Sequence, residues 1–199
     1  MQCAWVVNYA FSRWAGVPIP CQCGVAWESG KGASRCPHQA VLVSAFGEAD
    51  MTNRRKGGAM ELDESVHAQI EALCKQGNEL AAAGSFDSAR DMYKSALQLL
   101  PGDHREWEAA TWIYVAIGDV HFRTADYEKC LECFFNAVQC ADGLGNPFIH
   151  LRLGQCCYES GSLDKSADEL TRAYMGAGLD IFMEDDPKYL AFLKTRIDM

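Results

Sequence analysis

Residues 77–96 read GNELAAAGSFDSARDMYKSA and place two helical patterns on either side of a short turn. Gly84 suits the end of the first helix, because glycine readily adopts the left-handed backbone conformation found there, and Ser85 suits the N-cap of the second. Small and aromatic residues then recur every three or four positions, which puts them on one helix face. The segment therefore predicts two antiparallel helices, in which small residues allow close approach and aromatic rings fill the remaining space.

The same helix pair recurs twice further along the chain. Gly77, Gly118 and Gly154 align on the first helix of each pair, at separations of 41 and 36 residues. The excess in the first gap, at residues 104–110, is expected to lengthen the first helix of the second pair. The aligned turn positions are Gly84, Ala125 and Gly161, and the apolar positions that follow them are Phe86, Tyr127 and Leu163. The aligned small positions are Ala89, Cys130 and Ala167, and the aligned large positions are Tyr93, Phe134 and Thr171. The last small positions are Ala96 and Ala137, and Tyr174 breaks the pattern in the third pair.

Helical spacing with capping and breaking residues at the ends predicts seven helices after residue 60. Asp103, with Glu106 three residues later, resembles a capping box and predicts the start of one long helix. Leu190, Leu193 and Ile197 form an apolar stripe that is expected to cap the last pair. The predicted helices cover about residues 61–84, 86–100, 103–123, 127–140, 147–159, 163–177 and 187–198.

The first repeat unit, residues 70–103, resembles the tetratricopeptide repeat, a family with a 34-residue period. The resemblance implies an all-α solenoid of three helix pairs followed by a capping helix at about residues 187–198. It places the repeats at about residues 70–103, 111–144 and 147–180 within a domain of residues 60–199. The matching positions are Gly77, Leu80, Gly84, Phe86, Ala89, Tyr93, Ala96 and Pro101.

Residues 1–59 are a different kind of sequence. They carry a net charge of +3, against −12 for residues 60–199, and several prolines and glycines interrupt any helical period. We expect an irregular, poorly ordered extension, in which the cysteines are unpaired thiols because their spacing differs from that of structural zinc sites. A secretory signal would need a basic start and an uninterrupted apolar core.

The segment Lys56–Met60 suggests where the native chain starts. Its codons can contain a purine-rich run that resembles a bacterial ribosome-binding sequence a few bases before a start codon, and the composition changes at the same point. We interpret Met60 as the native start and residues 1–59 as an over-extended reading frame, with Met51 as the weaker candidate.

Composition excludes several functions. The chain has 199 residues and a net charge of −9, which argues against nucleic-acid binding, and it has no apolar run long enough to span a membrane. No nucleophile–base pair, phosphate loop or carboxylate pair predicts an enzyme or a cofactor.

The scattered histidines predict no metal site, and His121 is expected to pack in the core. Cys130, Cys133, Cys156 and Cys157 are interpreted as reduced packing thiols of a cytoplasmic protein.

In the family resembled, the first helix of each pair lines a concave groove that binds proteins. Carrying those positions over gives an aromatic and apolar surface with acidic residues at its edge, which is typical of a protein-binding site. Some of these residues were equally consistent with a core position, Leu151 among them. The candidate partner-binding residues are Glu71, Asn78, Trp112, Val115, Asp119, Arg123, Phe148, Leu151, Gln155, Tyr158 and Glu159.

The acidic domain predicts a protein partner with a basic surface, and the oligomeric state is open. Small acidic proteins of this kind resemble bacterial immunity proteins that neutralise a basic toxin, which is the first hypothesis. The alternative is a chaperone like those of type III secretion, which hold a translocator segment in the groove; a general scaffold and an enzyme rank below both. A carboxylate clamp for chaperone C-termini is not expected, because only Asn78 and Arg152 match its residues.

Overall fold

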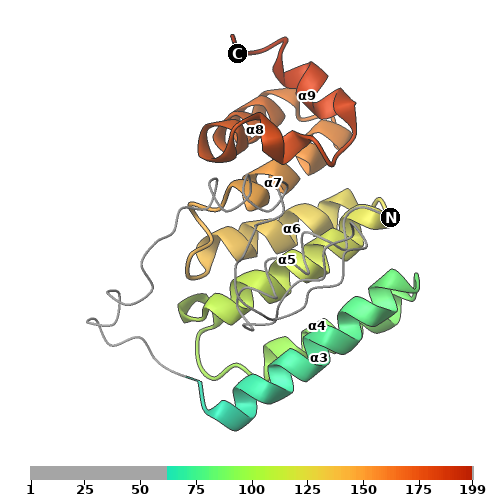
Figure 1. The fold of residues 1–199 in the computed structure, drawn as a ribbon, viewed down its shortest axis with the longest axis vertical. Coiled ribbons are helices and arrows are strands. Elements are labelled where there is room, and N and C mark those ends of the chain that lie inside the picture. The colour runs from blue at the N-terminus through green and yellow to red at the C-terminus, as the bar shows by residue number, and fades with distance from the viewer. Residues whose placement is uncertain (1–61, 199) are drawn as a thin grey trace, which may run out of the picture.

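The protein folds into helix pairs stacked along one long axis (Figure 1). The computed structural model describes residues 62–198, and every regular element in this range is helical. The expectation of an all-α fold is confirmed. The elements are α3 (Glu64–Ala82), α4 (Phe86–Gln98), η1 (His104–Glu106), α5 (Glu108–Arg123), α6 (Tyr127–Gln139), α7 (Pro147–Glu159), α8 (Leu163–Ala177), η2 (Leu179–Phe182) and α9 (Pro187–Leu193), where η marks a 3-10 helix.

Two expectations fall outside the described residues. They are the irregular extension of residues 1–59 and the start at Met60. Within residues 62–198, no helix has the length and apolar character that crossing a membrane requires.

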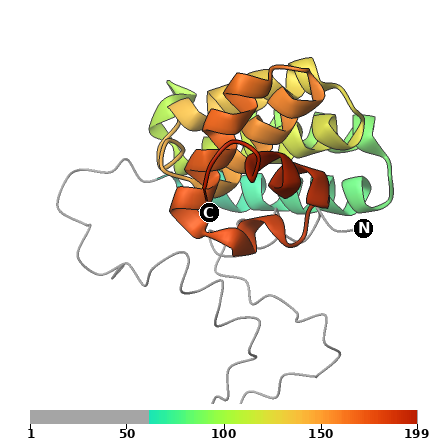
Figure 2. The same ribbon diagram turned by 90° about the horizontal axis from the view of Figure 1, so that it is seen from above.

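Three helix pairs, α3 with α4, α5 with α6 and α7 with α8, form the body of the structure. Consecutive pairs contact each other through α4 and α5 and then through α6 and α7, so that each pair packs on its neighbour. Figure 2 looks down on this stack, with the C-terminal elements nearest to the viewer. The arrangement is the tetratricopeptide-like helical stack that the repeat pattern predicts.

A glycine on the first helix of each pair lies directly against a large side chain of the second. A Cβ atom on Gly77 would lie 2.5 Å from Tyr93 Cε1, and one on Gly118 would lie 2.7 Å from Phe134 Cε2. Tyr93 and Phe134 are both buried. Since real Cβ atoms do not approach that closely, the helix spacing in these pairs requires glycine.

The third pair keeps the same contact, which corrects the predicted alignment by one residue. Gly154 faces Leu170, whose Cγ would lie 2.6 Å from an added Cβ. The buried small positions are Ser166 and Ala173, each fully inaccessible, and not the predicted Ala167. Ser166 Oγ donates to the Gly154 carbonyl oxygen at 2.8 Å, so a small polar residue satisfies this position. The apparent break of the pattern at Tyr174 therefore comes from the one-residue offset, since Ala173 holds the last small position.

The predicted turns are confirmed by their backbone angles. Gly84 and Gly161 have φ of 80° and 76°, and Ala125 at the equivalent turn of the second pair has φ of 56°. Ala125 adopts this left-handed conformation although its Cβ makes it unfavourable. The fold thus imposes the same turn on all three pairs.

Of the inserted residues 104–110, only the last three lengthen α5, and the predicted long helix from Asp103 is broken at Trp107. Asp103 caps η1 instead, accepting a hydrogen bond from Arg105 N at 3.0 Å. Trp107 is extended, with φ of −108° and ψ of 125°, and its indole Nε1 donates to the Pro101 carbonyl oxygen at 2.8 Å. Burial of this indole keeps Trp107 extended, so the helix is interrupted there and α5 starts only at Glu108.

The C-terminal helix α9 covers the last pair as expected, although it ends at Leu193 and not near residue 198. Tyr189 and Leu193 are buried, and Leu190 and Ile197 are half-buried against the core. Asp186 caps the helix by accepting from Lys188 N at 2.9 Å. These contacts end the stack with a covered apolar face.

Replacing Gly118 by alanine should destabilise the protein by about 1–3 kcal/mol, because the added methyl group must displace the Phe134 ring from a closely packed core. Urea unfolding followed by circular dichroism measures the change. Gly145→Ala is the matched control, since nothing lies within 4 Å of a Cβ there. Equal stabilities of the two variants would contradict the role given to the glycine contact.

Replacing Ala125 by glycine should stabilise the protein by about 0.5 kcal/mol. Glycine removes the cost of a left-handed alanine, and the greater entropy of the unfolded glycine chain offsets part of the gain. The reverse exchange, Gly161→Ala, should destabilise by about 1 kcal/mol for the same reason. A loss of thermal stability in Ala125→Gly would argue against this explanation.

Candidate protein-binding face

The candidate partner-binding residues all lie on the first helices of the three pairs, α3, α5 and α7. Apart from the adjacent Tyr158 and Glu159, they recur at intervals of three, four and seven residues, which places them along one side of each helix. The structure divides them by exposure into two groups. The half-buried residues are Glu71, Asn78, Trp112, Arg123, Tyr158 and Glu159, and the buried ones are Val115, Asp119, Phe148, Leu151 and Gln155.

For the buried group, the core position is the alternative that the structure shows. Val115 and Leu151 are 1% exposed and Gln155 is inaccessible. The first helix of an inner pair is contacted by its own partner helix and by the neighbouring pair, which leaves little free surface. On α7 this extends over the whole stretch Pro147–Cys157, every residue of which is buried. Phe148 and Asp119 belong to the same buried group, in the surroundings of Arg152.

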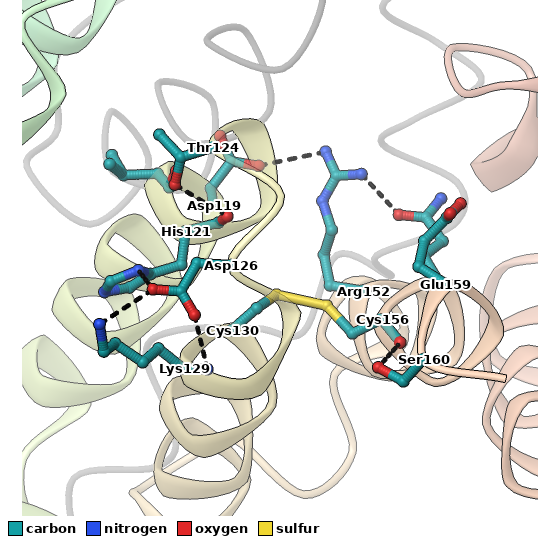
Figure 3. Close-up of a disulfide and its surroundings, with 12 residues drawn as sticks. Asp119, His121, Thr124, Asp126, Lys129, Cys130, Arg152, Cys156, Glu159 and Ser160 are labelled. Carbon is teal, nitrogen blue, oxygen red and sulfur yellow. Dashed lines mark hydrogen bonds and ion pairs between the residues drawn. A yellow bond between two sulfur atoms is a disulfide. The ribbon is translucent and has the colours of Figure 1, made fainter. Parts of the chain in front are cut away.

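Arg152 is the largest fully buried side chain of the described residues, and it connects three parts of the chain. Its Nη1 donates to Gln155 Oε1 at 2.6 Å and to Asp185 Oδ1 at 2.9 Å. Its Nη2 lies 3.3 Å from Asp119 Oδ1 (Figure 3). Burial raises the pKa of Asp119, while the Arg152 charge acts in the opposite direction. The guanidinium thus joins α5, α7 and the segment before α9.

Two aromatic rings flank the same guanidinium. Arg152 Cζ lies 4.9 Å from the centre of the Phe122 ring and 5.1 Å from that of Phe148. Stacking between aromatic faces favours arginine, whose planar cation is weakly hydrated. Phe148 is therefore a packing residue beneath the arginine.

A carboxylate clamp is not formed by the two residues that match one. Arg152 already pairs with Asp119 and Asp185, and Asn78 Oδ1 accepts a hydrogen bond from Tyr93 Oη at 2.6 Å. Both side chains serve contacts within the chain.

Tyr158 and Glu159, at the end of α7, contact the C-terminal helix. The Tyr158 ring packs edge to face against Tyr189 and Phe192, with ring centres 5.5 and 5.1 Å apart. Glu159 Oε1 accepts from Tyr189 Oη at 2.7 Å and lies 2.8 Å from Lys188 Nζ. In the third pair, the chain's own C-terminus therefore occupies positions that were expected to meet a partner.

The remaining half-buried candidates, Glu71, Asn78, Trp112 and Arg123, lie on α3 and α5, and we call them the α3–α5 face. Trp112 Nε1 donates to Glu108 Oε1 at 3.4 Å, which leaves the indole ring half-buried at the helix surface. Arg123 Cζ lies 4.8 Å from the centre of a phenyl ring on α4. The four half-buried side chains of α3 and α5 are thus an aromatic ring, an acid, an amide and a base.

Sequence reasoning missed the role of Asp185. Asp185 and Asp186 precede Pro187, and an acid just before a helix suits its cap. Asp186 is the cap, which leaves Asp185 to bind Arg152 across 33 residues of sequence. A second acid beside the capping one was the only signal in the sequence that Asp185 has another role. Nothing in the neighbouring sequence identifies Arg152 as its partner.

The histidines and cysteines form no metal site among residues 62–198. His121 is buried as predicted, with Nδ1 3.3 Å from Asp126 Oδ2. The prediction of reduced thiols is wrong for one pair, because Cys130 and Cys156 form a disulfide (Figure 3). Cys133 and Cys157 are free. The disulfide joins cysteines of two different helix pairs, 26 residues apart, so no short cysteine spacing motif predicts it.

Comparisons with known proteins give little about identity. No protein-family model and no curated protein matches the chain. Among 24 similar chains of solved structures is PcrH, crystallised in complex with the chaperone binding region of PopB. It is 18% identical, the match covers 67% of this chain and 94% of that one, and the TM-score is 0.48. Membership of the tetratricopeptide family therefore stays a prediction.

The contact of Glu159 with α9 should make stability depend on pH. Burial opposes ionisation of Glu159, but hydrogen bonds from Lys188 and Tyr189 outweigh it and hold the pKa below its usual value of 4.5. A lowered folded-state pKa contributes stability above the unfolded pKa, and that contribution is lost as the pH falls through the folded one. The urea midpoint of the wild type should therefore exceed that of Glu159→Gln at pH 6, and the two should converge below pH 4.5.

The difference in urea midpoint between the wild type and Glu159→Gln reports on this one carboxylate. General acid unfolding cancels, because all other groups titrate in both proteins. Glu128→Gln, an exposed acid on α6, serves as the control and should give a difference near zero at both pH values. A constant gap between wild type and Glu159→Gln from pH 6 down to pH 3.5 would contradict the prediction.

Proposed function

We propose that this chain is a non-catalytic protein-binding module of the tetratricopeptide type, and that the α3–α5 face carries the contact. The observation that supports it is the half-buried Trp112 on α5, whose indole Nε1 donates to Glu108 at the helix surface. Tryptophan and arginine at the centre of a polar surface are the residues that contribute most to protein association. The buried candidates on α7 and those that hold α9 are left out of the proposed surface.

The charge of the domain indicates the kind of partner. Residues 60–199 carry 12 basic and 24 acidic side chains, so a basic protein would be attracted and oriented by complementary potential. A small acidic protein that binds a basic toxin domain in the cytoplasm fits this charge and the resemblance to bacterial immunity proteins. We therefore propose an immunity function, in which binding covers the toxin's basic surface.

The alternative is a chaperone that holds an extended translocator segment. Such a segment would need an inner surface running along all three pairs. Here α9 covers Tyr158 and Glu159 at the third pair. The proposed face spans the first two pairs, which suits a folded surface better than a long peptide.

The test uses the full chain as bait for the basic proteins encoded beside its gene, expressed together with it. We expect a one-to-one complex and recovery of growth when the toxin is produced. Trp112→Ala should weaken the complex at least tenfold, because truncating a central aromatic residue commonly costs about 2 kcal/mol of binding. Phe135→Ala is the control, since this phenylalanine is 50% exposed on the outer helix α6.

Each other outcome has a defined meaning. A complex with an extended secreted segment, without growth rescue, would replace immunity by the chaperone alternative. Equal binding by Trp112→Ala and the wild type would remove the α3–α5 face from the proposal. Turnover of a small substrate by the isolated protein would contradict a non-catalytic role.

A further inference from the structure

We propose that the Cys130–Cys156 disulfide is a reversible redox crosslink that locks the second helix pair to the third. The two cysteines come from α6 and α7, the helices through which these pairs meet, and their Cα atoms are 6.8 Å apart. Both residues are inaccessible to solvent. Figure 3 shows the bond crossing between the two helices, beside Arg152. The partner-related consequence rests on the proposed function, whereas the crosslink itself does not.

The position matters because neighbouring repeats are coupled only through their shared interface. In a stack of helix pairs, stability is a sum of terms within each pair and between neighbours. A covalent bond between α6 and α7 acts on one of these between-pair terms. It therefore fixes how the third pair sits on the second, without changing either pair internally.

The free thiols of the domain argue for reversible formation. Four further cysteines of the described residues stay reduced beside the single disulfide: Cys74, Cys133, Cys140 and Cys157. Proteins of oxidising compartments seldom keep so many unpaired thiols, whereas in reducing compartments a disulfide is usually a transient, regulated one.

The two cysteines nearest to the crosslink are poor competitors for it. Cys133 lies one helical turn from Cys130, and burial raises its pKa to about 11. Cys157 is adjacent to Cys156 and buried, and burial raises its pKa as well. Burial disfavours the thiolate at all four positions, so the specificity of pairing comes from placement. Cys130 and Cys156 meet across the contact between α6 and α7, whereas Cys133 and Cys157 are free.

The chemistry is exchange with a low-molecular-weight disulfide. After the α6–α7 contact opens, the thiolate of one of the two cysteines attacks a sulfur of that disulfide and releases one small thiol. The second protein thiolate then attacks the mixed disulfide and releases the other. Two protein thiols are oxidised and the small disulfide is reduced to two thiols, which carry the two protons. An excess of a small dithiol reverses the reaction.

The crosslink also bears on the Arg152 contacts. Arg152 is one turn before Cys156 on α7, and its partner Asp119 lies on α5 in the second pair. Fixing α7 against α6 holds the guanidinium where Asp119 and Asp185 can both reach it. Reduction leaves this arrangement to non-covalent contacts, so the third pair can open away from the proposed binding face.

The first experiment measures thiols in the full chain, which has ten cysteines. Protein is equilibrated with reduced or oxidised glutathione, denatured, alkylated with N-ethylmaleimide and digested. Mass spectrometry then gives the masses of the peptides. We expect a peptide pair linked through Cys130 and Cys156 in the oxidised sample and its loss in the reduced one. A linked pair that persists under millimolar dithiothreitol in native conditions would overturn reversibility. Absence of this pair in oxidised protein would overturn the crosslink.

The second experiment asks whether the bond locks the two pairs. Hydrogen exchange of α6 and α7 amides should be slower in the oxidised protein. The unfolding equilibrium should shift by about 400-fold, as expected for a crosslink between residues 26 positions apart. Cys130→Ala should fold, since alanine occupies the equivalent position of the first pair at Ala89, and should lose all redox dependence. Cys133→Ala should keep it.

Equal redox dependence in Cys130→Ala and the wild type would overturn the proposal, as would equal exchange of α6 and α7 in both redox states. None of these measurements uses a binding partner. Failure of the proposed function would therefore leave them unchanged, and their failure would leave the α3–α5 face to be tested separately.

Discussion

The contact between a glycine and a large side chain within each helix pair sets the spacing on which the remaining structure depends. Tyr93 and Phe134 lie where a Cβ on the facing glycine would stand, and Leu170 does so in the third pair. Close approach of the two helices buries the small residues beside them, and the turns at Gly84, Ala125 and Gly161 follow from the same geometry. Each pair is thereby a unit of similar thickness, which allows the units to stack.

Stacking leaves little of the inner helices free. Residues that a regular solenoid would present along a groove are covered here in two ways. On α7, burial extends over most of the helix, and Arg152 fills the interior with a charge that Asp119 and Asp185 compensate. At its end, Tyr158 and Glu159 hold α9. Removing one member of a buried ion group leaves the others uncompensated, so this region is better suited to holding the stack together than to exchanging ligands.

Two interactions therefore govern how the third pair relates to the second. One is the Arg152 ion group, which joins α5, α7 and the C-terminal segment, and the other is the disulfide between α6 and α7. The binding face that we propose lies on α3 and α5, and α5 also carries Asp119 of the ion group. The proposed face belongs to the first two pairs, whereas the proposed crosslink lies where the second pair meets the third.

The local pattern of residues was sufficient to predict the helix pairs, their turns and the capping helix. Such features depend on neighbours within one or two helical turns, and helical period, glycine and capping residues record them directly. The bounds of α7 and α8 agree with prediction for this reason. Even the one-residue error at Ser166 concerned alignment, while the helix itself was correctly placed.

Contacts between distant segments were settled by packing alone. Asp185 binds an arginine 33 residues away. Even the break at Trp107, whose indole donates to the Pro101 carbonyl six residues before it, depends on burial of the ring. The Cys130–Cys156 bond and the burial of Gln155 likewise depend on how one pair sits on the next. A sequence records the period of each helix, but the choice of partner across an interface arises only when the helices pack together in three dimensions.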